Sequence, residues 1–444
     1  MITPRTLKGF RDFLPEVMLP RERLIDTAAA VYRSYGFAPI DTPALEYLEI
    51  LQGKGSDETD KQLYQFTDHG NRSVGMRFDL TVPLARFTAQ HFAELTFPFK
   101  RYHFGKVWRG ENTQAGRYRE FMQCDFDTIG TKSLTADIET VLVINDLLER
   151  IDIKSKQTFT RFKIRINNRK VLNGLLDKHG IADKTVPVLR ALDKIHKVGK
   201  DAVWKEMTDA AGISETAAAA VLQLSELTGT NGEILTALEK LLSGNTLGGE
   251  GISELEQLTS AVRSVGADDN RITIDVSIAR GLDYYTGTIY ETFLDDLPGI
   301  GSVCSGGRYD NLAGLYTKQE LPGIGASLGL DRLISAMEEL GMLEKISTPV
   351  FLFMPYFVEN RLADYLRFAS QLRRRGLGVE FYPEAKKLGN QLKYADKRGF
   401  RFAVIIGEEE FAQALCKIKN LTTGESIDCK QNEAAEYFLL ARPQ

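Results

Sequence analysis

The pattern of hydrophobic and polar positions is most regular from Arg271 to Ile278, where isoleucine or valine stands at every second position. A period of two predicts a strand with one face in the core, and Thr288 to Phe293 predicts a second strand. The segment between them contains Arg280, Tyr284 and Tyr285. A guanidinium suits phosphate or carboxylate, and tyrosine rings and hydroxyls suit a small polar ligand. Taken alone, the segment could equally be a ligand site or a β-turn with tyrosines in the core and an arginine in solvent.

A second pair of strands is predicted from Phe99 to Glu111 and from Phe121 to Gly130, joined by a polar loop. Alternation directs Met122, Cys124 and Phe126 toward a core, puts Gln123, Asp125 and Asp127 on the opposite face, and places Arg109 and Glu111 on one common face. A sheet face this rich in charge is costly unless water or a ligand covers it. Together with the segment around Arg280, it favours a ligand site over a solvated face.

The first part of the chain predicts a helix from Pro20 to Tyr35, with Pro20 in its first turn. An extended, proline-bounded stretch follows from Phe37 to Glu46 and suits the edge of a sheet. A strand begins at Ser73, and alternation along it places three polar side chains on one face, namely Arg77, Asp79 and Thr81.

The segment from Leu321 to Leu333 contains Gly323, Gly325 and Gly329. Their spacing is wrong for a dinucleotide-binding loop, and no strand–helix–strand unit frames them. The segment instead predicts a strand whose small residues let a planar ligand lie close. A helix starting at Leu330 would then carry Arg332 into the site in its first turn.

Helical periodicity dominates other regions. Ser133 to Ile151 predicts one long helix. From Asn168 to Asp269 the chain is rich in alanine and leucine at helical spacing, with a break at Gly244–Gly251. We interpret this region as a helical insertion between two parts of one sheet domain. From Thr348, strands alternate with helices and predict a small α/β domain.

Composition narrows the function classes. The chain has 444 residues and a net charge of −4, so it is not a globally basic nucleic-acid binder, although residues 348–444 carry 15 Lys and Arg against 12 Asp and Glu. The four cysteines and five histidines form neither Cys-x-x-Cys nor His-Glu-x-x-His, which disfavours a zinc site. No apolar run has the ~20 residues of a membrane span, and no secretion signal is present. We therefore expect a cytoplasmic protein without a membrane anchor.

These segments together resemble a class II aminoacyl-tRNA synthetase, and within that class the histidyl-tRNA synthetase family. The matching segments are the helix and strand ending at Pro43 (motif 1), Trp108–Glu111 with Gly116–Phe121 (motif 2), Gly325–Leu333 (motif 3), and the family-specific Arg280–Tyr285 and Gly306–Asp310. The resemblance covers essentially the whole chain. One departure is Arg77-Phe-Asp-Leu-Thr81, where the commonest bacterial pattern has Arg-Pro-Glu-Gly-Thr.

The resemblance implies a fold and a domain plan. It implies an α+β catalytic domain on a mixed, largely antiparallel sheet (residues 1–167 and 268–345), a helical insertion (168–267) and a C-terminal α/β anticodon-binding domain (348–444). It also implies a homodimer that uses L-histidine, ATP with Mg²⁺, and tRNA(His). The amino acid would be activated as histidyl-adenylate and then transferred to the 3′ end of the tRNA.

The resemblance also implies roles for particular residues. The catalytic residues would be Arg109, Arg280 and Gln123; the ATP-binding residues Arg109, Glu111, Arg117, Arg280 and Arg332; and the histidine-binding residues Asp79, Leu80, Thr81, Arg109, Gln123, Asp127, Arg280, Tyr284, Tyr285 and Tyr309. No metal site formed by protein groups alone is implied, because Mg²⁺ would arrive with ATP.

The alternative is a related protein class without synthetase activity, the histidine-sensing regulatory subunit of ATP phosphoribosyltransferase. That class lacks the anticodon-binding domain and has lost catalytic arginines. This chain keeps Arg109, Arg280 and Arg332 and continues well beyond Thr348, which favours the enzyme.

Overall fold

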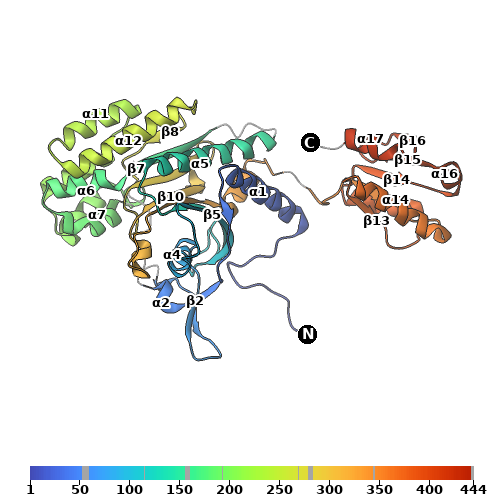
Figure 1. Cartoon of the computed structure of the whole chain (residues 1–444), viewed down its shortest axis with the longest axis horizontal. Helices are drawn as coiled ribbons and strands as arrows, with labels where there is room; N and C mark the ends of the chain where they lie inside the picture. Colours follow the sequence, from blue (N-terminus) through green and yellow to red (C-terminus); the bar gives the residue numbers. More distant parts are fainter. Residues whose placement is uncertain are drawn as a thin grey trace. The chain divides into compact units, whose positions relative to one another are not determined.

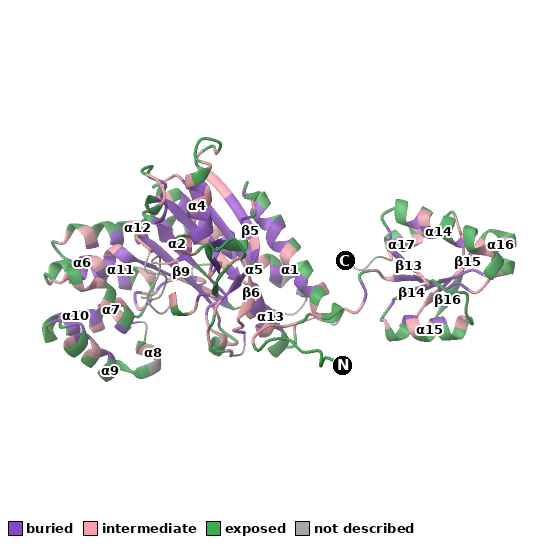
Figure 2. Ribbon diagram, turned by 90° about the horizontal axis from the view of Figure 1, so that it is seen from below, coloured by how far each residue is buried: buried purple, intermediate pink, exposed green. Residues whose placement is uncertain are grey.

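The computed structural model describes residues 1–52, 60–114, 116–155, 161–192, 194–268, 270–278, 284–343 and 346–441. Contacts between Cα atoms divide the chain into two compact units, one of residues 1–12 and 24–343 and one of residues 13–23 and 344–444. Each unit has its own sheet and its own buried core. Buried residues concentrate on the strands and on the inner faces of the helices (Figure 2).

The first unit is built on an eight-stranded sheet (Figure 1). In spatial order its strands are β1 (Ala38–Pro39), β5 (Phe99–Trp108), β6 (Glu120–Ile129), β11 (Gly323–Gly329), β10 (Cys304–Tyr309), β9 (Thr288–Leu294), β7 (Phe162–Asn168) and β8 (Ile272–Ile274). Pairing is antiparallel from β5 to β7, and only the edge strands β1 and β8 pair in parallel. This mixed, mainly antiparallel sheet confirms the predicted fold class.

One face of this sheet is covered by α5 (Leu134–Ser155) and by residues 24–34 of α1 (Pro15–Ser34), with α13 (Leu330–Glu339) following β11. Tyr32 of α1 packs 4.9 Å from the Phe126 ring and donates a hydrogen bond to the Cys124 carbonyl. The predicted core direction of Cys124 and Phe126 is therefore confirmed, since both are fully buried.

The predicted start of the first helix is wrong. The helix begins at Pro15 and runs through Pro20. Pro15 occupies the first helical position, where the missing N–H of proline costs nothing. The Leu14 carbonyl accepts hydrogen bonds from Val17 and Met18 and so closes the first turn.

The strand that begins at Ser73 is shorter than predicted. It forms β4 (Ser73–Met76) in a three-stranded sheet with β2 (Leu45–Tyr47) and β3 (Gln65–Thr67), beside α2 (Leu48–Leu51). The predicted alternation through Thr81 is wrong, because Thr81 begins α4 (Thr81–Gln90). Asp79 Oδ1 accepts the Val82 N–H at 3.0 Å and satisfies a backbone donor of the first helical turn.

The region after β7 is helical, as predicted. Its elements are α6 (Arg169–Lys178), η1 (Ala182–Lys184), α7 (Thr185–Leu192), α8 (Ile195–Val198), α9 (Lys200–Lys205), η2 (Glu206–Ala210), α10 (Glu215–Ser225), α11 (Asn231–Leu241) and α12 (Thr246–Ser264). Short η3 (Pro298–Ile300) and η4 (Leu312–Leu315) flank β10. The helices belong to the same compact unit as the large sheet, so the limits of the insertion stay a prediction.

The expected break at Gly244–Gly251 is wrong over most of its length, because α12 begins at Thr246. The glycines serve close helix packing instead. A Cβ on Gly174 of α6 would lie 2.5 Å from the Gly248 nitrogen, and one on Gly251 would lie 2.9 Å from the Val171 nitrogen. The backbones of α6 and α12 approach so closely at these positions that a residue larger than glycine does not fit.

The C-terminal unit has a five-stranded sheet in the order β13 (Val379–Phe381), β12 (Leu352–Met354), β14 (Phe402–Ile405), β15 (Leu415–Asn420) and β16 (Ser426–Lys430). Its helices are η5 (Glu359–Arg361), α14 (Leu362–Arg374), α15 (Leu388–Lys397), α16 (Glu408–Gln413) and α17 (Ala434–Leu440). The strand–helix alternation agrees with the prediction, except that the short, glutamate-rich α16 was not foreseen. Among the residues described, no helix is long and apolar enough to cross a membrane.

The contact between α6 and α12 predicts a difference between two chemically identical substitutions. Gly174→Ala should destabilise the fold by about 1–3 kcal/mol, because the added methyl group meets backbone atoms that cannot move aside. Gly249→Ala is the matched control, since a Cβ there meets nothing within 4 Å and alanine favours a helix by about 1 kcal/mol. Urea unfolding measures both; equal effects would contradict the packing argument.

Candidate active site

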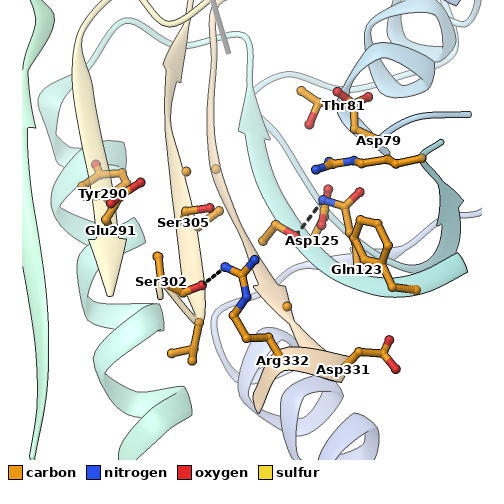
Figure 3. Close-up of a pocket in the computed structure, with 18 of the residues that line it drawn as sticks. Asp79, Thr81, Gln123, Asp125, Tyr290, Glu291, Ser302, Ser305, Asp331 and Arg332 are labelled. Carbon is orange, nitrogen blue, oxygen red and sulfur yellow. Dashed lines mark hydrogen bonds between the residues drawn. The ribbon is translucent and has the colours of Figure 1, made fainter. Parts of the chain in front are cut away.

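A cavity of about 430 Å³ lies on the face of the large sheet that carries Gln123 and Asp127, and Figure 3 shows its lining. The predicted site residues that line it are Asp79, Thr81, Arg109, Glu111, Arg117, Gln123, Asp127, Tyr284, Tyr285, Tyr309 and Arg332. Leu80 is fully buried and does not line the cavity, so its predicted part in binding stays a prediction. Arg280 lies outside the described residues.

Strand register brings these side chains together. Asp127 of β6 stands opposite Arg101 of β5 on one side and Gly325 of β11 on the other. Two residues along, Asp125 stands between His103 and Ser327. Side chains two residues apart on a strand share a face, so Asp125 and Asp127 both face the cavity.

The glycines of β11 make room for protein side chains. A Cβ on Gly325 would lie 2.2 Å from Asp127 Oδ1, and one on Gly323 would lie 2.3 Å from the Tyr309 ring. We had expected the small residues of this strand to admit a planar ligand. At Gly323 and Gly325, Tyr309 and Asp127 occupy that space.

Asp127 is held from two sides. The Tyr309 hydroxyl donates to Oδ1 at 2.5 Å, and Arg101 Nη2 lies 2.6 Å from Oδ2. Burial raises the pKa of Asp127 above its usual range, while the Arg101 charge and the Tyr309 hydrogen bond oppose that rise. The carboxylate is therefore fixed in orientation at one end of the cavity.

Asp125 was placed on the correct face by the sequence pattern, but no role was assigned to it. Burial raises its pKa to about 7, and nearby Asp127 adds to the rise, whereas Arg101 and a Ser327 hydrogen bond oppose it. Gln123, next on the same face, donates from Nε2 to Ser327 Oγ at 3.1 Å. These groups form a polar floor beneath the cavity (Figure 3).

Cations occupy the other part of the cavity. Arg109 lies between the rings of Phe78 and Phe121, at 4.3 and 5.0 Å, and its Nε donates to the Phe78 carbonyl at 3.1 Å. Burial lowers the pKa of Arg109, although an arginine remains charged at neutral pH. Asp79 is the carboxylate with which the Arg109 charge interacts most strongly, so the site keeps a desolvated positive charge beside an acidic group.

Two more arginines line the same part. Arg117 Nη1 lies 3.9 Å from Glu111 Oε2, and Arg332 in the first turn of α13 donates to the Ser302 carbonyl (Figure 3). The predicted entry of Arg332 from the start of a helix after Leu330 agrees with the structure.

The chain start completes this region. Arg11 forms an ion pair with Asp331 at 2.5 Å and lies over the Tyr118 ring at 3.2 Å. The other oxygen of Asp331 accepts the Met122 N–H at 2.8 Å. The Arg119 N–H donates to the Gly9 carbonyl at 3.0 Å.

Sequence reasoning missed a polar row across the sheet. Ser305 of β10 stands opposite Ser327 on one side and Glu291 of β9 on the other, and all three line the cavity. The signal was available for Glu291, which lies in the predicted strand from Thr288 to Phe293, but no strand was predicted over Ser305. Arg101 was also missed. It does not line the cavity, and it contributes to the site only through its cross-strand partner Asp127.

The arrangement suits a small zwitterion joined to a polyanion. Carboxylates, an amide and tyrosine hydroxyls can accept or orient an ammonium and a polar ring, while arginines can bind phosphates. Among the described residues, no group of three His, Cys, Asp or Glu side chains could hold a metal ion by itself.

Comparisons with known proteins identify the family of the chain. The family model described as histidyl-tRNA synthetase matches residues 9–333, and one described as an anticodon binding domain matches residues 357–440. A histidine–tRNA ligase of Rhodopirellula baltica is 60% identical over 96% of both chains, and one of Wolinella succinogenes is 44% identical over 99% of both. The crystal structure of histidyl-tRNA synthetase from Nostoc sp. PCC 7120 superposes with a TM-score of 0.88 at 37% identity, covering 99% of this chain and 100% of that one.

The antiparallel sheet, the arginine-bearing cavity and these matches define an aminoacyl-tRNA synthetase of class II. Within that class, the chain belongs to the histidyl-tRNA synthetase family.

The raised pKa of Asp125 predicts how stability depends on pH. Its folded-state pKa of about 7 lies above the unfolded value near 3.8, so ionisation opposes folding above about pH 4 and does so fully above pH 7. Asp125→Asn should therefore raise the free energy of unfolding at pH 8 by on the order of 1–4 kcal/mol. The gain should shrink between pH 7 and pH 4 and vanish below. Denaturant unfolding without ligand tests this; a gain independent of pH would contradict it.

Proposed function

We propose that the protein is a histidine–tRNA ligase that activates L-histidine with ATP and transfers it to the 3′ end of tRNA(His). The observation that carries this proposal is that one cavity is lined both by Asp79, Gln123 and Asp127 and by Arg109 and other arginines. Full-length identity of 60% to a protein named histidine–tRNA ligase supports it.

The carboxylate part of the cavity would bind histidine. Asp79, Thr81 and Gln123 would hold the α-ammonium group, and Asp127 and Tyr285 would bind the imidazole. Tyr284 and Tyr309 would complete the walls, and their T-shaped ring packing at 5.9 Å supports that role. A site that satisfies both ring nitrogens rejects analogues by roughly 10⁴-fold, because their binding would leave buried polar groups unpaired. No separate editing step is then required.

The arginine part would bind ATP. Arg109 and Arg280 would flank the α-phosphate, Arg117 and Arg332 would hold the pyrophosphate, and Glu111 would face the adenine or a metal. The attacking carboxylate of histidine is ionised at neutral pH, with a reference pKa of about 3.5, so it needs no general base. Catalysis then depends on in-line positioning and on positive charge around the phosphoryl oxygens.

Mg²⁺ would be bound mainly through the phosphates of ATP. The described part of the chain has no cluster of three metal-binding side chains, and Mg²⁺ commonly takes one or two carboxylates together with phosphates and water. Glu111, which lines the cavity beside Arg117, fits such a single carboxylate. The metal would neutralise charge on the phosphates.

The C-terminal unit would bind the anticodon of the tRNA, as its family match indicates. We also propose a cytoplasmic location, because the proposed substrates, ATP, histidine and tRNA, are used in translation.

The alternative function, a regulatory subunit, has support from one similar solved structure. That structure is described as an ATP phosphoribosyltransferase regulatory subunit/histidyl-tRNA synthetase from Bacillus halodurans C and matches at 22% identity with a TM-score of 0.72. At that identity it supports the fold alone.

Histidine-dependent exchange of pyrophosphate into ATP tests the function directly. The wild-type protein should catalyse exchange with histidine and with no other amino acid, and it should charge tRNA(His). Arg280→His should slow adenylate formation by roughly 10²-fold, the usual loss for one preorganised donor, with little change in histidine or ATP binding. Arg280→Lys should rescue only in part, because an ammonium lacks the guanidinium fork. Unchanged first-step rates in Arg280→His would make that residue structural.

A homodimer is the proposed assembly. The expected two-fold interface is the helix from Pro20 to Tyr35 with the proline-bounded stretch that follows it. Leu45 and Tyr47, at the end of that stretch, and Phe66 of the same three-stranded sheet are apolar and 45–51% exposed. Sedimentation at micromolar concentration should give twice the 49.7 kDa chain mass. Tyr47→Glu with Phe66→Glu should shift the protein toward monomer, whereas a fully active wild-type monomer would refute the assembly.

A further inference from the structure

Arg101 is a charged side chain placed where a stable fold would not need one. It is the third residue of β5, it is 0% exposed, and it stands directly across from Asp127. Its Nη2 forms an ion pair with Asp127 Oδ2 at 2.6 Å. None of its three guanidinium nitrogens has a hydrogen-bond acceptor of suitable geometry among the described residues.

Such a pair contributes little to stability. Removing two charges from water costs several kcal/mol per ion, and a buried pair replaced by apolar side chains is often equally stable or more stable. Unpaired buried N–H groups add to that cost. The position of Arg101 is therefore better explained by its electrostatic effect on the carboxylates that line the cavity.

The neighbours of Arg101 are carboxylates. Its charge opposes the burial that raises the pKa of Asp79, of Asp125 and of Asp127. Its neighbour along the strand, His103, adds no second cation, because burial and the charges of Arg101 and Arg77 lower the pKa of His103 to about 4. Arg101 is thus the main opposing charge at Asp125 and Asp127, whereas Arg109 acts more strongly at Asp79.

The contact with Asp127 has a chemical consequence for recognition. Tyr309 donates a hydrogen bond to Oδ1, and the positive charge of Arg101 lies 2.6 Å from Oδ2 without a hydrogen bond between them, so the contact favours the ionised carboxylate, which can only accept. A protonated Asp127 would present a donor instead. A neutral imidazole has one N–H and one nitrogen lone pair, so the protonation state of Asp127 decides with which ring nitrogen it forms a hydrogen bond.

We propose that Arg101 is a positioning residue for amino-acid selectivity, which keeps Asp127 an oriented, ionised acceptor for the ring N–H of the substrate. Arg101 itself does not touch the substrate. The proposal rests on the proposed function, in which Asp127 meets the imidazole.

The test compares Arg101→Gln and Arg101→Lys with the wild type. Arg101→Gln should raise the KM for histidine by roughly 10- to 100-fold, the scale of one hydrogen bond to a charged group, and leave the KM for ATP within about twofold. Arg101→Lys should recover part of the loss, because a charge remains. The ratio of kcat/KM for histidine over thienylalanine, whose ring has no N–H, should fall in Arg101→Gln.

A pH profile separates positioning from a structural role. Without Arg101, the pKa of Asp127 rises, so histidine binding by Arg101→Gln should begin to weaken at a higher pH than in the wild type. The other groups that face Asp127 are Asp125 on β6, Tyr309 on β10, Tyr285 before β9, Asp79 before α4 and His103 on β5, and loss of the Arg101 charge also raises the pKa of Asp125, of Asp79 and of His103. The comparison is therefore repeated in an Asp125→Asn background, which removes the carboxyl that titrates at about pH 7. An acid-side loss that persists there reports Asp127, the carboxylate that Arg101 pairs with directly. An identical profile would overturn the proposal.

Arg308→Gln is the matched control. Arg308 is also a buried arginine paired with a buried aspartate, Asp137, but neither residue lines the cavity. It should lower the melting temperature without changing the pH profile or the ratio for histidine over thienylalanine. Should Arg101→Gln fold poorly, the double variant Arg101→Gln with Asp127→Asn removes the uncompensated charge, and calorimetry should then show the same weakened histidine affinity as Asp127→Asn alone, because Arg101 acts through Asp127.

The outcomes also separate the inference from the function beneath it. If the wild type shows no histidine-dependent exchange, the proposed function fails. If the wild type is active and Arg101→Gln changes only the melting temperature, as Arg308→Gln does, then Arg101 is structural and the inference alone is wrong.

Discussion

The antiparallel register of β5, β6 and β11 is the constraint on which the site depends. It sets Asp127 between Arg101 and Gly325, and Asp125 between His103 and Ser327. A shift by one residue would turn these groups into the hydrophobic core and bring core residues into the cavity. The packing of Tyr32 against Phe126 on the opposite face prevents such a shift, so the core and the chemistry stabilise the same register.

Burial of charge is the second theme. Burial favours the protonated form of the carboxyl groups in the site. Nearby arginines, which are themselves desolvated, oppose this and favour the ionised form. Electrostatic interactions are stronger in such an environment than in water. A ligand with one ammonium, one carboxylate and a polar ring can therefore be recognised strongly within about 430 Å³.

Strand alternation was enough to predict which residues of β6 face the cavity, because side-chain direction in a strand follows from sequence alone. It failed beyond Met76, where β4 ends and α4 begins at Thr81, with Asp79 accepting a hydrogen bond from the first helical turn. Arg101 could not be identified as part of the site, because its importance arises from a cross-strand partner that a single sequence does not reveal. The glycines around Gly248 were misinterpreted for a similar reason: the partner helix that requires them is about 70 residues away in the chain.

The contact of Arg11 with Asp331 joins positions 320 residues apart. On the ribosome, the first residues to emerge must therefore wait for most of the chain before their partner exists. Until α13 is synthesised, Tyr118 and the segment between β5 and β6 have only part of their support. Completion of the cavity is consequently a late event in biosynthesis, and a nascent chain that stops before residue 331 would have a formed β5–β6 hairpin but an unfinished cavity wall.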